Sequence, residues 1–286
     1  MRKNLIKKEY LKKIKQFENY NKKYFDENKP IISDSDFDNL KYEIIELEKK
    51  YQYLKSKNSP SNKVGFKPSK NFKKANHKVP MLSLSNAFSE EDLINFEKKT
   101  ANFLSVKSDF KLFYSVEPKI DGISASLTYE NGNFVRGLSR GDGKEGEDIT
   151  DNLNTIKDIP KKIVSKDFPE AIDIRGEVFI RNSKFENLRD KFANPRNAAS
   201  GSLRQKNPED TKKIPLNFIA YTFGFENGLK VENQSDFLKK LEEWGFKINP
   251  LNKLISGVEN LIDNYNKIEK KRADLDFDID GIVYKV

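Results

Sequence analysis

A lysine lies between two acidic residues in the stretch 116–122, which reads Val-Glu-Pro-Lys-Ile-Asp-Gly. The apolar run over residues 112–116 predicts a strand that leads into it. Because side chains two apart on a strand share a face, Glu117, Lys119 and Asp121 are expected to point the same way. An amine held near carboxylates at the end of a strand suits nucleophilic attack, Schiff-base formation or phosphate binding. An ion-paired lysine on a strand edge is the structural alternative.

Four later stretches also gather charged residues and glycines. They cover residues 139–148, 174–179, 192–205 and 277–286. The first of them has three glycines in a predicted turn, which lets the backbone approach a ligand closely. The third is expected to be a polar loop that carries Arg196 and Arg204. Each stretch alone is compatible with a solvated loop or an ion pair. Together they put cations and acids where a nucleotide and a metal would bind.

The last of these stretches alternates in a way that predicts a strand. Alternation puts Asp278, Asp280 and Tyr284 on one face. It puts Lys285 on the opposite face, together with apolar neighbours.

Helices and strands that would position these residues follow from periodicity. Helices are predicted over 4–24, from Ser33 onward, after Ser89, and over 183–191, 234–244 and 258–272. Strands are predicted over 172–180, 217–225 and 277–286, and Asn131-Gly132 predicts a hairpin turn. Ser33 with Asp36 and Ser89 with Asp92 have the spacing of capping boxes. The helix after Ser89 is expected to turn Leu93, Phe96 and Phe103 inward. Hairpins beside helices favour an antiparallel-rich α+β fold over a parallel doubly wound sheet.

The composition limits the possible functions. The 286 residues, enough for two domains, include 53 Lys and Arg against 44 Asp and Glu, for a net charge of +9. That excess favours a nucleic-acid partner over a membrane, with a generally lysine-rich composition as the alternative. The absence of cysteine excludes disulfides and thiolate zinc sites and predicts a cytoplasmic protein. The single histidine, His77, argues against a Ser-His-Asp triad and is interpreted as structural.

The five stretches resemble the nucleotidyltransferase motifs of the bacterial NAD-dependent DNA ligases. Lys-x-Asp-Gly at 119–122 alone indicates only a covalent nucleotidyltransferase. The Arg-Gly-Asp-Gly turn at 140–143, the Asn-Pro-Arg-Asn stretch at 194–197 and Pro-Met-Leu-Ser-Leu at 80–84 favour the NAD-dependent branch. The resemblance covers nearly the whole chain. It implies a helical NMN-binding module over residues 1–66 and an antiparallel-rich, ATP-grasp-like adenylation domain over 67–286.

The resemblance also implies a reaction. Lys119 would attack the α-phosphate of NAD, release NMN and carry AMP, which later passes to the 5′-phosphate of a DNA nick. Asp121 is the second expected catalytic residue. Mg2+, with Mn2+ as a substitute, is expected to neutralise phosphate charge, and no residue is assigned as its ligand. The expected partners are NAD and nicked double-stranded DNA, with no membrane, and the chain is expected to be a monomer.

Binding residues follow from the same resemblance. The expected adenine contacts are Glu117 and Lys285, with Ser83 and Leu84 lining that pocket. Arg140 and Glu177 are expected to contact ribose or adenosine, and Arg196 and Arg204 to contact phosphates of the cofactor or of the nick. The expected NMN contacts in the helical module are Tyr24, Phe25, Asp34, Phe37 and Asp38. The family usually has His or Tyr at the position of Phe25, and Tyr at the position of Phe37. Because phenylalanine lacks the polar atom of those residues, the affinity for NAD is expected to be lower.

The sequence ends one residue after Lys285, where the family continues into another lysine-bearing strand and an oligonucleotide-binding fold. We therefore expect a fragment that binds NAD, adenylates itself weakly and does not seal nicks alone. Two alternatives are a fragment that only binds NAD or DNA and a nucleotidyltransferase that uses ATP. The helical module argues against the use of ATP.

Overall fold

The computed structural model describes residues 2–25, 31–32, 34–55, 59, 72–106 and 111–286, with no account of the side chains at 2, 24, 25, 34, 35 and 38. The chain divides into two compact units. The first comprises Met1–Leu82 and Arg140–Glu147, and the second Ser83–Ser139 and Asp148–Val286. The predicted division at residue 66 stays a prediction.

A pair of helices makes up most of the first unit, as the periodicity predicts. These are α1 (Arg2–Phe25) and α2 (Asp34–Lys50), followed by the short helix η1 (Gln52–Leu54). Their buried core consists of Tyr10, Ile14, Phe17, Ile44 and Leu54. The carboxylate of Glu48 is buried beneath this core and accepts hydrogen bonds from the Tyr10 hydroxyl at 2.7 Å and the Ser59 hydroxyl at 2.8 Å. The predicted cap at Ser33 lies outside the described residues.

A small sheet completes the first unit. Strand β1 (Lys74–Asn76) pairs antiparallel with β5 (Glu145–Glu147). The turn before β5 is also bound to the segment after β1, because the backbone N–H groups of His77 and Met81 donate to the carbonyls of Lys144 and Gly143, each at 2.8 Å.

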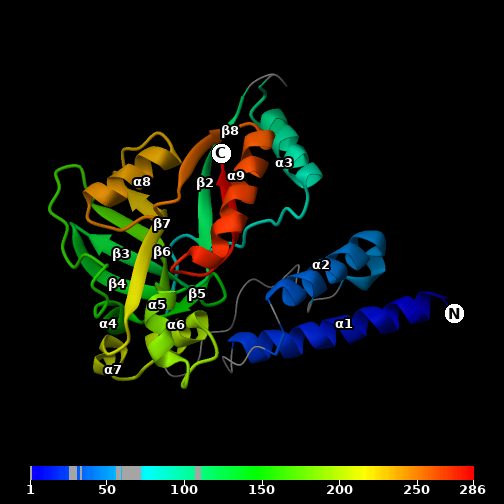
Figure 1. The fold of residues 1–286 in the computed structure, drawn as a ribbon, viewed down its shortest axis with the longest axis horizontal. Coiled ribbons are helices and arrows are strands. Elements are labelled where there is room, and N and C mark those ends of the chain that lie inside the picture. The colour runs from blue at the N-terminus through cyan, green and yellow to red at the C-terminus, as the bar shows by residue number, and fades with distance from the viewer. Residues whose placement is uncertain (1, 26–30, 33, 56–58, 60–71, 107–110) are drawn as a thin grey trace. The chain divides into compact units, whose positions relative to one another are not determined.

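The second unit contains two antiparallel sheets (Figure 1). One has the order β8-β2-β9, with β2 (Phe113–Ile120) between β8 (Lys253–Ser256) and β9 (Ile279–Lys285). The other has the order β4-β3-β6-β7 and consists of β3 (Ile123–Glu130), β4 (Asn133–Ser139), β6 (Ala171–Ile180) and β7 (Leu216–Asn227). The predicted turn joins β3 to β4, with positive φ at both Asn131 and Gly132. The antiparallel-rich α+β fold class is confirmed.

Most helices of the second unit follow the sequence prediction. Helices α8 (Gln234–Glu243) and α9 (Val258–Lys271) lie where periodicity places them. The helix predicted over 183–191 is wrong in length, because α5 (Asn182–Phe185) gives way to the short helix η2 (Glu186–Leu188). Three short helices were not predicted: α4 (Thr150–Leu153), α6 (Pro195–Leu203) and α7 (Pro208–Lys212).

The polar loop predicted around Arg196 is instead helix α6. The Asn194 side chain accepts a hydrogen bond from the backbone N–H of Asn197, and Pro195 occupies the first helical turn. Both are start signals for a helix, since the cap satisfies a free N–H and proline lacks one. Small buried residues such as Ala198 and Ala199 then let the helix pack closely against the sheet.

Helix α3 (Glu90–Phe103) begins with the predicted capping box of Ser89 and Asp92. The prediction that Leu93, Phe96 and Phe103 point into a core is wrong for Phe103, whereas Leu93 is partly buried and the Phe96 ring contacts Tyr114 with centroids 6.3 Å apart. No residue of α3 is buried, and Phe103 is 88% exposed. A periodic apolar pattern determines which residues share a helix face, but not whether another element covers that face.

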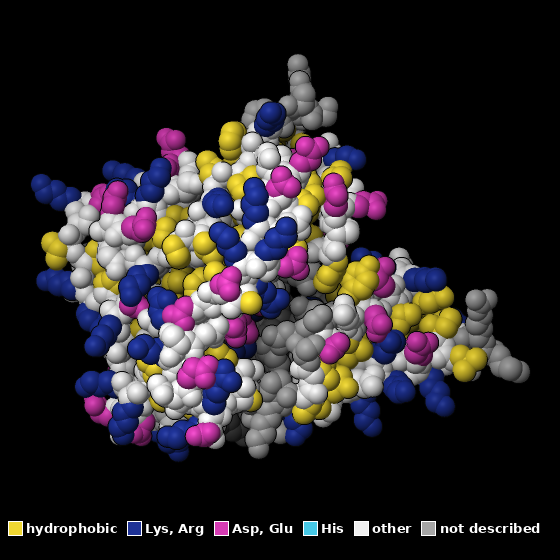
Figure 2. All heavy atoms as spheres, viewed as in Figure 1, with side chains coloured by type: hydrophobic (Ala, Val, Ile, Leu, Met, Phe, Trp, Pro, Cys, Tyr) yellow, Lys and Arg dark blue, Asp and Glu magenta, His cyan; other side chains and the backbone are white. Residues whose placement is uncertain are grey.

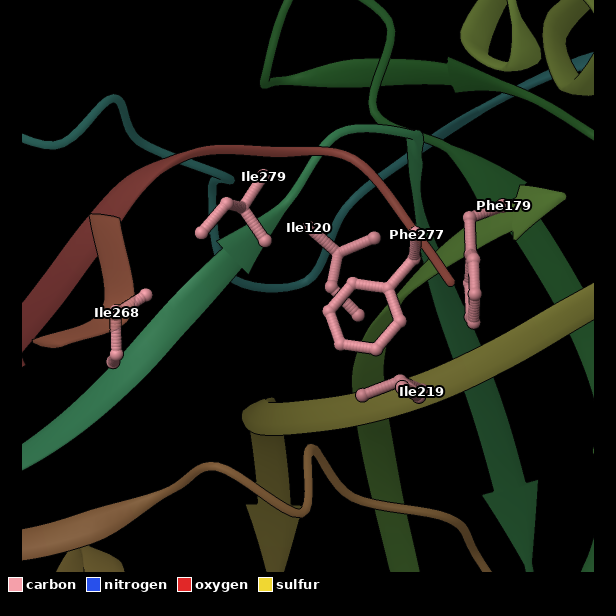
Figure 3. Packing of buried hydrophobic residues seen from close by; sticks show 6 residues of the cluster. All are labelled: Ile120, Phe179, Ile219, Ile268, Phe277 and Ile279. Atoms are coloured by element: carbon pink, nitrogen blue, oxygen red, sulfur yellow. The ribbon is translucent and has the colours of Figure 1, made fainter. Parts of the chain in front are cut away.

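The core that joins the two sheets lies next to the lysine motif. Ile120 from the end of β2 packs with Phe277, which precedes β9, and with Phe179 and Ile219 from β6 and β7 (Figure 3). The Phe179 and Phe277 rings meet edge to face, with centroids 6.0 Å apart. Because Ile120 is buried here, the residues on either side of it are held at a fixed place between the sheets.

The surface carries charges of both signs. In the view of Figure 2, lysine and arginine side chains are interspersed with acidic ones over the visible face. Among the described residues, no helix has the length and apolar character needed to cross a bilayer.

Candidate functional site

The pairing of β2 with β9 sets the geometry of the site. Pro118 pairs with Ile282, and Ile120 pairs with Ile279. Between these two pairs β2 has one residue, Lys119, whereas β9 has two, Asp280 and Gly281. This is a β-bulge. Gly281 in it has a φ of 146°, a backbone conformation that residues with a Cβ rarely adopt.

The bulge overturns the predicted alternation of β9. An extra residue reverses which face the following side chains occupy. As a result Asp280 and Lys285, which were predicted on opposite faces, both contact side chains of β2 on its site face. Tyr284 packs on the other side, against Tyr114 and Val116.

Lys119 and its neighbours form the first cluster, called here the Lys119 cluster. The Lys119 ammonium pairs with the Asp280 carboxylate, and its side chain is 47% exposed. Arg196, near the start of α6, pairs with Asp121 at 2.5 Å. The loop that holds Asp121 is tied to β9, because its backbone N–H donates to the Asp278 carbonyl at 2.9 Å.

Glu177 of β6 completes the Lys119 cluster. Its carboxylate accepts a hydrogen bond from the Ser124 hydroxyl of β3 at 2.8 Å. Burial raises the pKa of Glu177 to about 7, although the nearby Arg196 and Lys119 cations oppose the shift. Burial likewise raises the pKa of Asp280, against the effect of Lys119. The cluster thus holds two cations among three carboxylates, two of which are reluctant to ionise.

A second, buried group surrounds Glu117 and is called here the Glu117 network. Glu117 Oε2 accepts from Lys285 Nζ at 2.7 Å, and Oε1 accepts from the Ser115 hydroxyl at 2.8 Å. Gln234 Nε2, at the start of α8, donates to the same Oε1 at 2.9 Å and to the Tyr221 carbonyl at 2.7 Å. Lys285 donates to that carbonyl too, at 2.9 Å. Burial lowers the pKa of Lys285, an effect that the Glu117 carboxylate opposes.

Arg140 belongs to the first compact unit, unlike the residues above. It lies in a tight turn, where a Cβ on Gly141 would be 1.9 Å from the Glu145 carbonyl oxygen. The Asp142 carboxylate accepts from the backbone N–H groups of Lys144 and Glu145. His77 Nε2 donates to the Arg140 carbonyl at 3.1 Å, so His77 is structural as predicted.

The other predicted residues are more scattered. Arg204 follows the last residue of α6, about 12 Å along the helix from Arg196, so the two arginines suit different phosphates. Ser83 and Leu84 are exposed, in the segment before α3. Phe37 stacks on Phe17 with ring centroids 4.9 Å apart. The side chains of the other expected NMN contacts, Tyr24, Phe25, Asp34 and Asp38, lie outside the described residues.

Sequence reasoning assigned no role to four residues that the structure places in the site. They are Ser115, Ser124, Gln234 and Asp280. Asp280 had a signal, since it lies in an Asp-x-Asp-Gly stretch. Gln234 had none, because it meets Glu117 across 117 positions of the chain.

This arrangement suits the transfer of a phosphorus-linked group to an amine. Lys119 is a half-exposed amine, and Arg196 is a neighbouring cation that can contact a phosphate. The Glu117 network is a buried acceptor and donor pair fit to recognise a base. Among the described residues, no group of three or more His, Cys, Asp or Glu side chains is placed to hold a metal ion.

Comparisons with known proteins identify relatives of this chain. Residues 69–286 match the NAD-dependent DNA ligase adenylation domain, and residues 3–65 match the DNA ligase-like N-terminal NAD+-binding domain. The chain is 64% identical to a DNA ligase of Pelagibacter ubique over 97% of this chain and 41% of that protein. DNA ligases of a Bradyrhizobium strain (ORS 278) and of Parvibaculum lavamentivorans are 46% and 45% identical over 95% of this chain. The chain spans 39% of each of these two relatives.

Proposed function

This chain belongs to the NAD-dependent DNA ligase adenylation family, and we propose that it performs the first step of ligation, the transfer of AMP from NAD to Lys119. The observation that carries this proposal is the position of Lys119, an accessible amine between the carboxylates of the Lys119 cluster and beside Arg196. In a longer protein of this family, the AMP would pass on to the 5′-phosphate of a nick in double-stranded DNA, in replication and repair.

The proposed step balances as a substitution at phosphorus. The Asp280 carboxylate, paired with Lys119, would take a proton from its ammonium. The bond from Nζ to the α-phosphorus of NAD then forms and the bond from that phosphorus to the bridging oxygen breaks, so NMN leaves with the oxygen and the electron pair. Arg196 is a suitable contact for the phosphate, because its planar guanidinium matches phosphate oxygens. Asp121 holds Arg196 in place through their ion pair at 2.5 Å. Arg204, which follows the last residue of α6, would contact a second phosphate, from the cofactor or from the nick.

Recognition of the nucleoside is proposed to fall to the Glu117 network and Glu177. Glu117 and Lys285 would contact the adenine, with Ser83 and Leu84 beside it. Glu177 and Arg140 would contact the ribose. A half-buried carboxyl whose pKa is raised to about 7 can donate or accept a hydrogen bond near neutral pH, which suits a sugar hydroxyl.

NMN is proposed to bind the helical module, through Tyr24, Phe25, Asp34, Phe37 and Asp38. The match of residues 3–65 to an NAD+-binding domain supports this assignment. The Phe37 ring contacts Phe17 in the core of the helix pair. Because phenylalanine side chains have no hydrogen-bonding group, the hydrogen bonds to NMN would fall to Tyr24, Asp34 and Asp38.

A magnesium ion fits the donor set only as a partly hydrated ion. Mg2+ is usually bound through one or two carboxylates together with water and substrate phosphates. Asp121 and Asp280 are carboxylates at the right place for this, and Mn2+ has similar preferences. When bound, the ion would neutralise charge on the phosphate.

The lack of cysteine supports a cytoplasmic site of action, and we propose that the chain acts as a monomer.

Intact-mass spectrometry after incubation with NAD and Mg2+ tests the proposal. We expect the mass of the chain to increase by one AMP, with no increase in the Lys119→Arg variant and none when ATP replaces NAD. An increase with ATP alone would show an ATP-using nucleotidyltransferase instead. Binding of NAD by calorimetry with no mass increase would leave a binding role only, and no binding would reject the proposal.

A further inference from the structure

Gln234 closes a ring of hydrogen bonds around Glu117. Its side-chain amide nitrogen donates to Glu117 Oε1 and to the Tyr221 carbonyl. Lys285 Nζ donates to Glu117 Oε2 and to the same carbonyl. Four groups are therefore linked in a closed circuit, from the carboxylate through the amide and the carbonyl to the ammonium. The members come from β2, β7, α8 and β9; Tyr221 and Gln234 are 13 positions apart, whereas Glu117 is separated from Gln234 by 117 and from Lys285 by 168.

The circuit fixes which way each polar atom points. Both hydrogens of the Gln234 amide are used, and the reversed amide would bring its oxygen against two acceptors. Glu117 Oε1 receives two hydrogen bonds, from Gln234 and Ser115, which use both of its lone pairs. Among the described residues, Oε2 receives one hydrogen bond, from Lys285, which leaves one lone pair for a ligand. Toward the same residues, Lys285 uses two of its three donors, which leaves one.

The hydrogen-bonding groups left for a ligand form a defined pattern: an acceptor on Glu117 Oε2 beside a donor on Lys285 Nζ. Adenine presents the complementary pattern, since its amino group donates and its ring nitrogen N1 accepts. Hypoxanthine presents the reverse, because its O6 accepts and its N1 carries a hydrogen. If the carboxylate rotated, the pattern would be lost. Gln234 and Ser115 hold Oε1 and therefore prevent that rotation.

We propose that Gln234 is a positioning residue for base specificity. By donating to both Glu117 Oε1 and the Tyr221 carbonyl, it keeps the Glu117 carboxylate and the Lys285 ammonium oriented to bind an amino-substituted purine. The inference rests on the proposed function, because it deepens the assignment of Glu117 and Lys285 as adenine contacts. Gln234 touches no part of the reacting phosphate in this account and acts only through Glu117.

The test uses NAD and its deaminated analogue, nicotinamide hypoxanthine dinucleotide, with calorimetry on the wild-type chain and on Gln234→Leu. Leucine has a similar volume and removes both donors. We expect Gln234→Leu to bind NAD about 10-fold more weakly, while its affinity for the hypoxanthine analogue changes by less than about 3-fold, so the preference for NAD narrows. The maximal rate of adenylation at saturating NAD should stay within about 3-fold of wild type, because the Lys119 cluster is untouched.

Two further variants keep the test informative. Ser115→Ala removes the other donor to Glu117 Oε1. It should lower the ratio of the affinity for NAD to that for the hypoxanthine analogue, but by a smaller factor than Gln234→Leu does. Lys239→Leu makes a polar-to-leucine change at an exposed position of the same helix and should leave the preference at the wild-type value. Should Gln234→Leu not fold, as judged by its circular dichroism, Ser115→Ala and Gln234→Glu carry the same comparison, with Gln234→Glu expected to bind NAD most weakly.

The two proposals fail in different ways. If the wild-type chain does not bind NAD, the proposed function is rejected and the inference with it. If the wild type binds NAD but folded Gln234→Leu keeps the wild-type preference, only the inference is overturned. An equal loss of affinity for both dinucleotides would also overturn it, since that result would show a general packing role.

Discussion

Glu117 and Lys119 are two residues apart on β2, yet their surroundings differ in kind. The Glu117 side chain is 6% exposed and accepts hydrogen bonds from three side chains. The Lys119 side chain is 47% exposed, and the ion pair that the structure gives it is with Asp280. One strand thus carries a buried polar network at Glu117 and an accessible, ion-paired amine at Lys119.

This difference in exposure follows from where the Glu117–Lys285 pair and the Lys119–Asp280 pair lie relative to the β-bulge. On one side of it, Lys285 is held by regular pairing of β9 with β2, and α8 adds Gln234. On the other side, the bulge at Gly281 places Asp280 beside Lys119. Buried charge pairs depend on every partner, whereas exposed ones exchange readily with water and ligands. We interpret the Glu117–Lys285 pair as suited to ligand recognition and the Lys119–Asp280 pair as suited to the chemical step.

The largest expected effect on stability comes from breaking the buried pair. Lys285→Met leaves the Glu117 carboxylate buried without its cation, and the free energy of unfolding should fall by about 3 kcal/mol. Urea denaturation followed by circular dichroism measures this value. The matched variant at the exposed pair, Lys119→Met, should change the free energy of unfolding by less than about 1 kcal/mol. Similar losses for the two variants would remove the contrast between the two regions.

The Lys119 cluster should respond to pH through Glu177. Burial raises the pKa of Glu177 from its ordinary value of 4.5 to about 7, so the folded chain holds this proton more tightly than the unfolded chain. Wild-type stability should therefore fall as pH rises from about 4.5 to about 7. Glu177→Gln removes this cost and should be more stable than wild type by about 3 kcal/mol at pH 8, and equally stable at pH 4. Thermal unfolding at the two pH values checks this.

Glu242→Gln serves as a control for the pH experiment, because Glu242 is exposed on α8. It should show the same stability as wild type at both pH values. A Glu177→Gln variant that is less stable than wild type at pH 8 would show that the ionised carboxylate is favoured in its site.

The bulge itself should have a smaller effect on stability and a specific effect on chemistry. Gly281→Ala forces a residue with a Cβ into a φ of 146° and should lower the free energy of unfolding by about 1 kcal/mol. Because Asp280 would shift relative to Lys119, the adenylation rate should fall by about 10-fold. Gly228→Ala makes the same change at another positive φ, away from both clusters, and should reproduce the stability loss alone. Equal adenylation rates for the two variants would mean that the bulge does not position Asp280.

Much of the fold could be predicted from the sequence where a local pattern determines it. The Asn131-Gly132 turn, strands β6 and β7, and helices α8 and α9 follow from turn chemistry and periodicity. Helix α6 was missed because its small and polar residues carry no apolar periodicity, although its cap and proline marked its start. The exposed face of α3 was missed because burial depends on what packs against a helix.

Some residues of the candidate site were predictable from the sequence, but their arrangement was not. The motifs identified Lys119, Glu117 and Lys285, because amine, carboxylate and strand spacing are visible in sequence. The face on which Asp280 lies depends on one extra residue in β9, and a strict alternation cannot show it. The contact between Gln234 and Glu117 depends on the packing of α8 beside the sheet and has no local signal.

Adenylation by NAD under single-turnover conditions tests the division between the two regions most directly. The rate constant of AMP transfer, measured by quenched intact-mass spectrometry over a range of NAD concentrations, gives a maximal rate and a half-saturating concentration for each variant. Lys119→Arg should abolish the maximal rate while NAD binding by calorimetry stays within about 3-fold of wild type. Glu117→Gln should raise the half-saturating concentration at least about 10-fold with a maximal rate near wild type. A Glu117→Gln variant that lost its maximal rate and kept its half-saturating concentration would contradict the account.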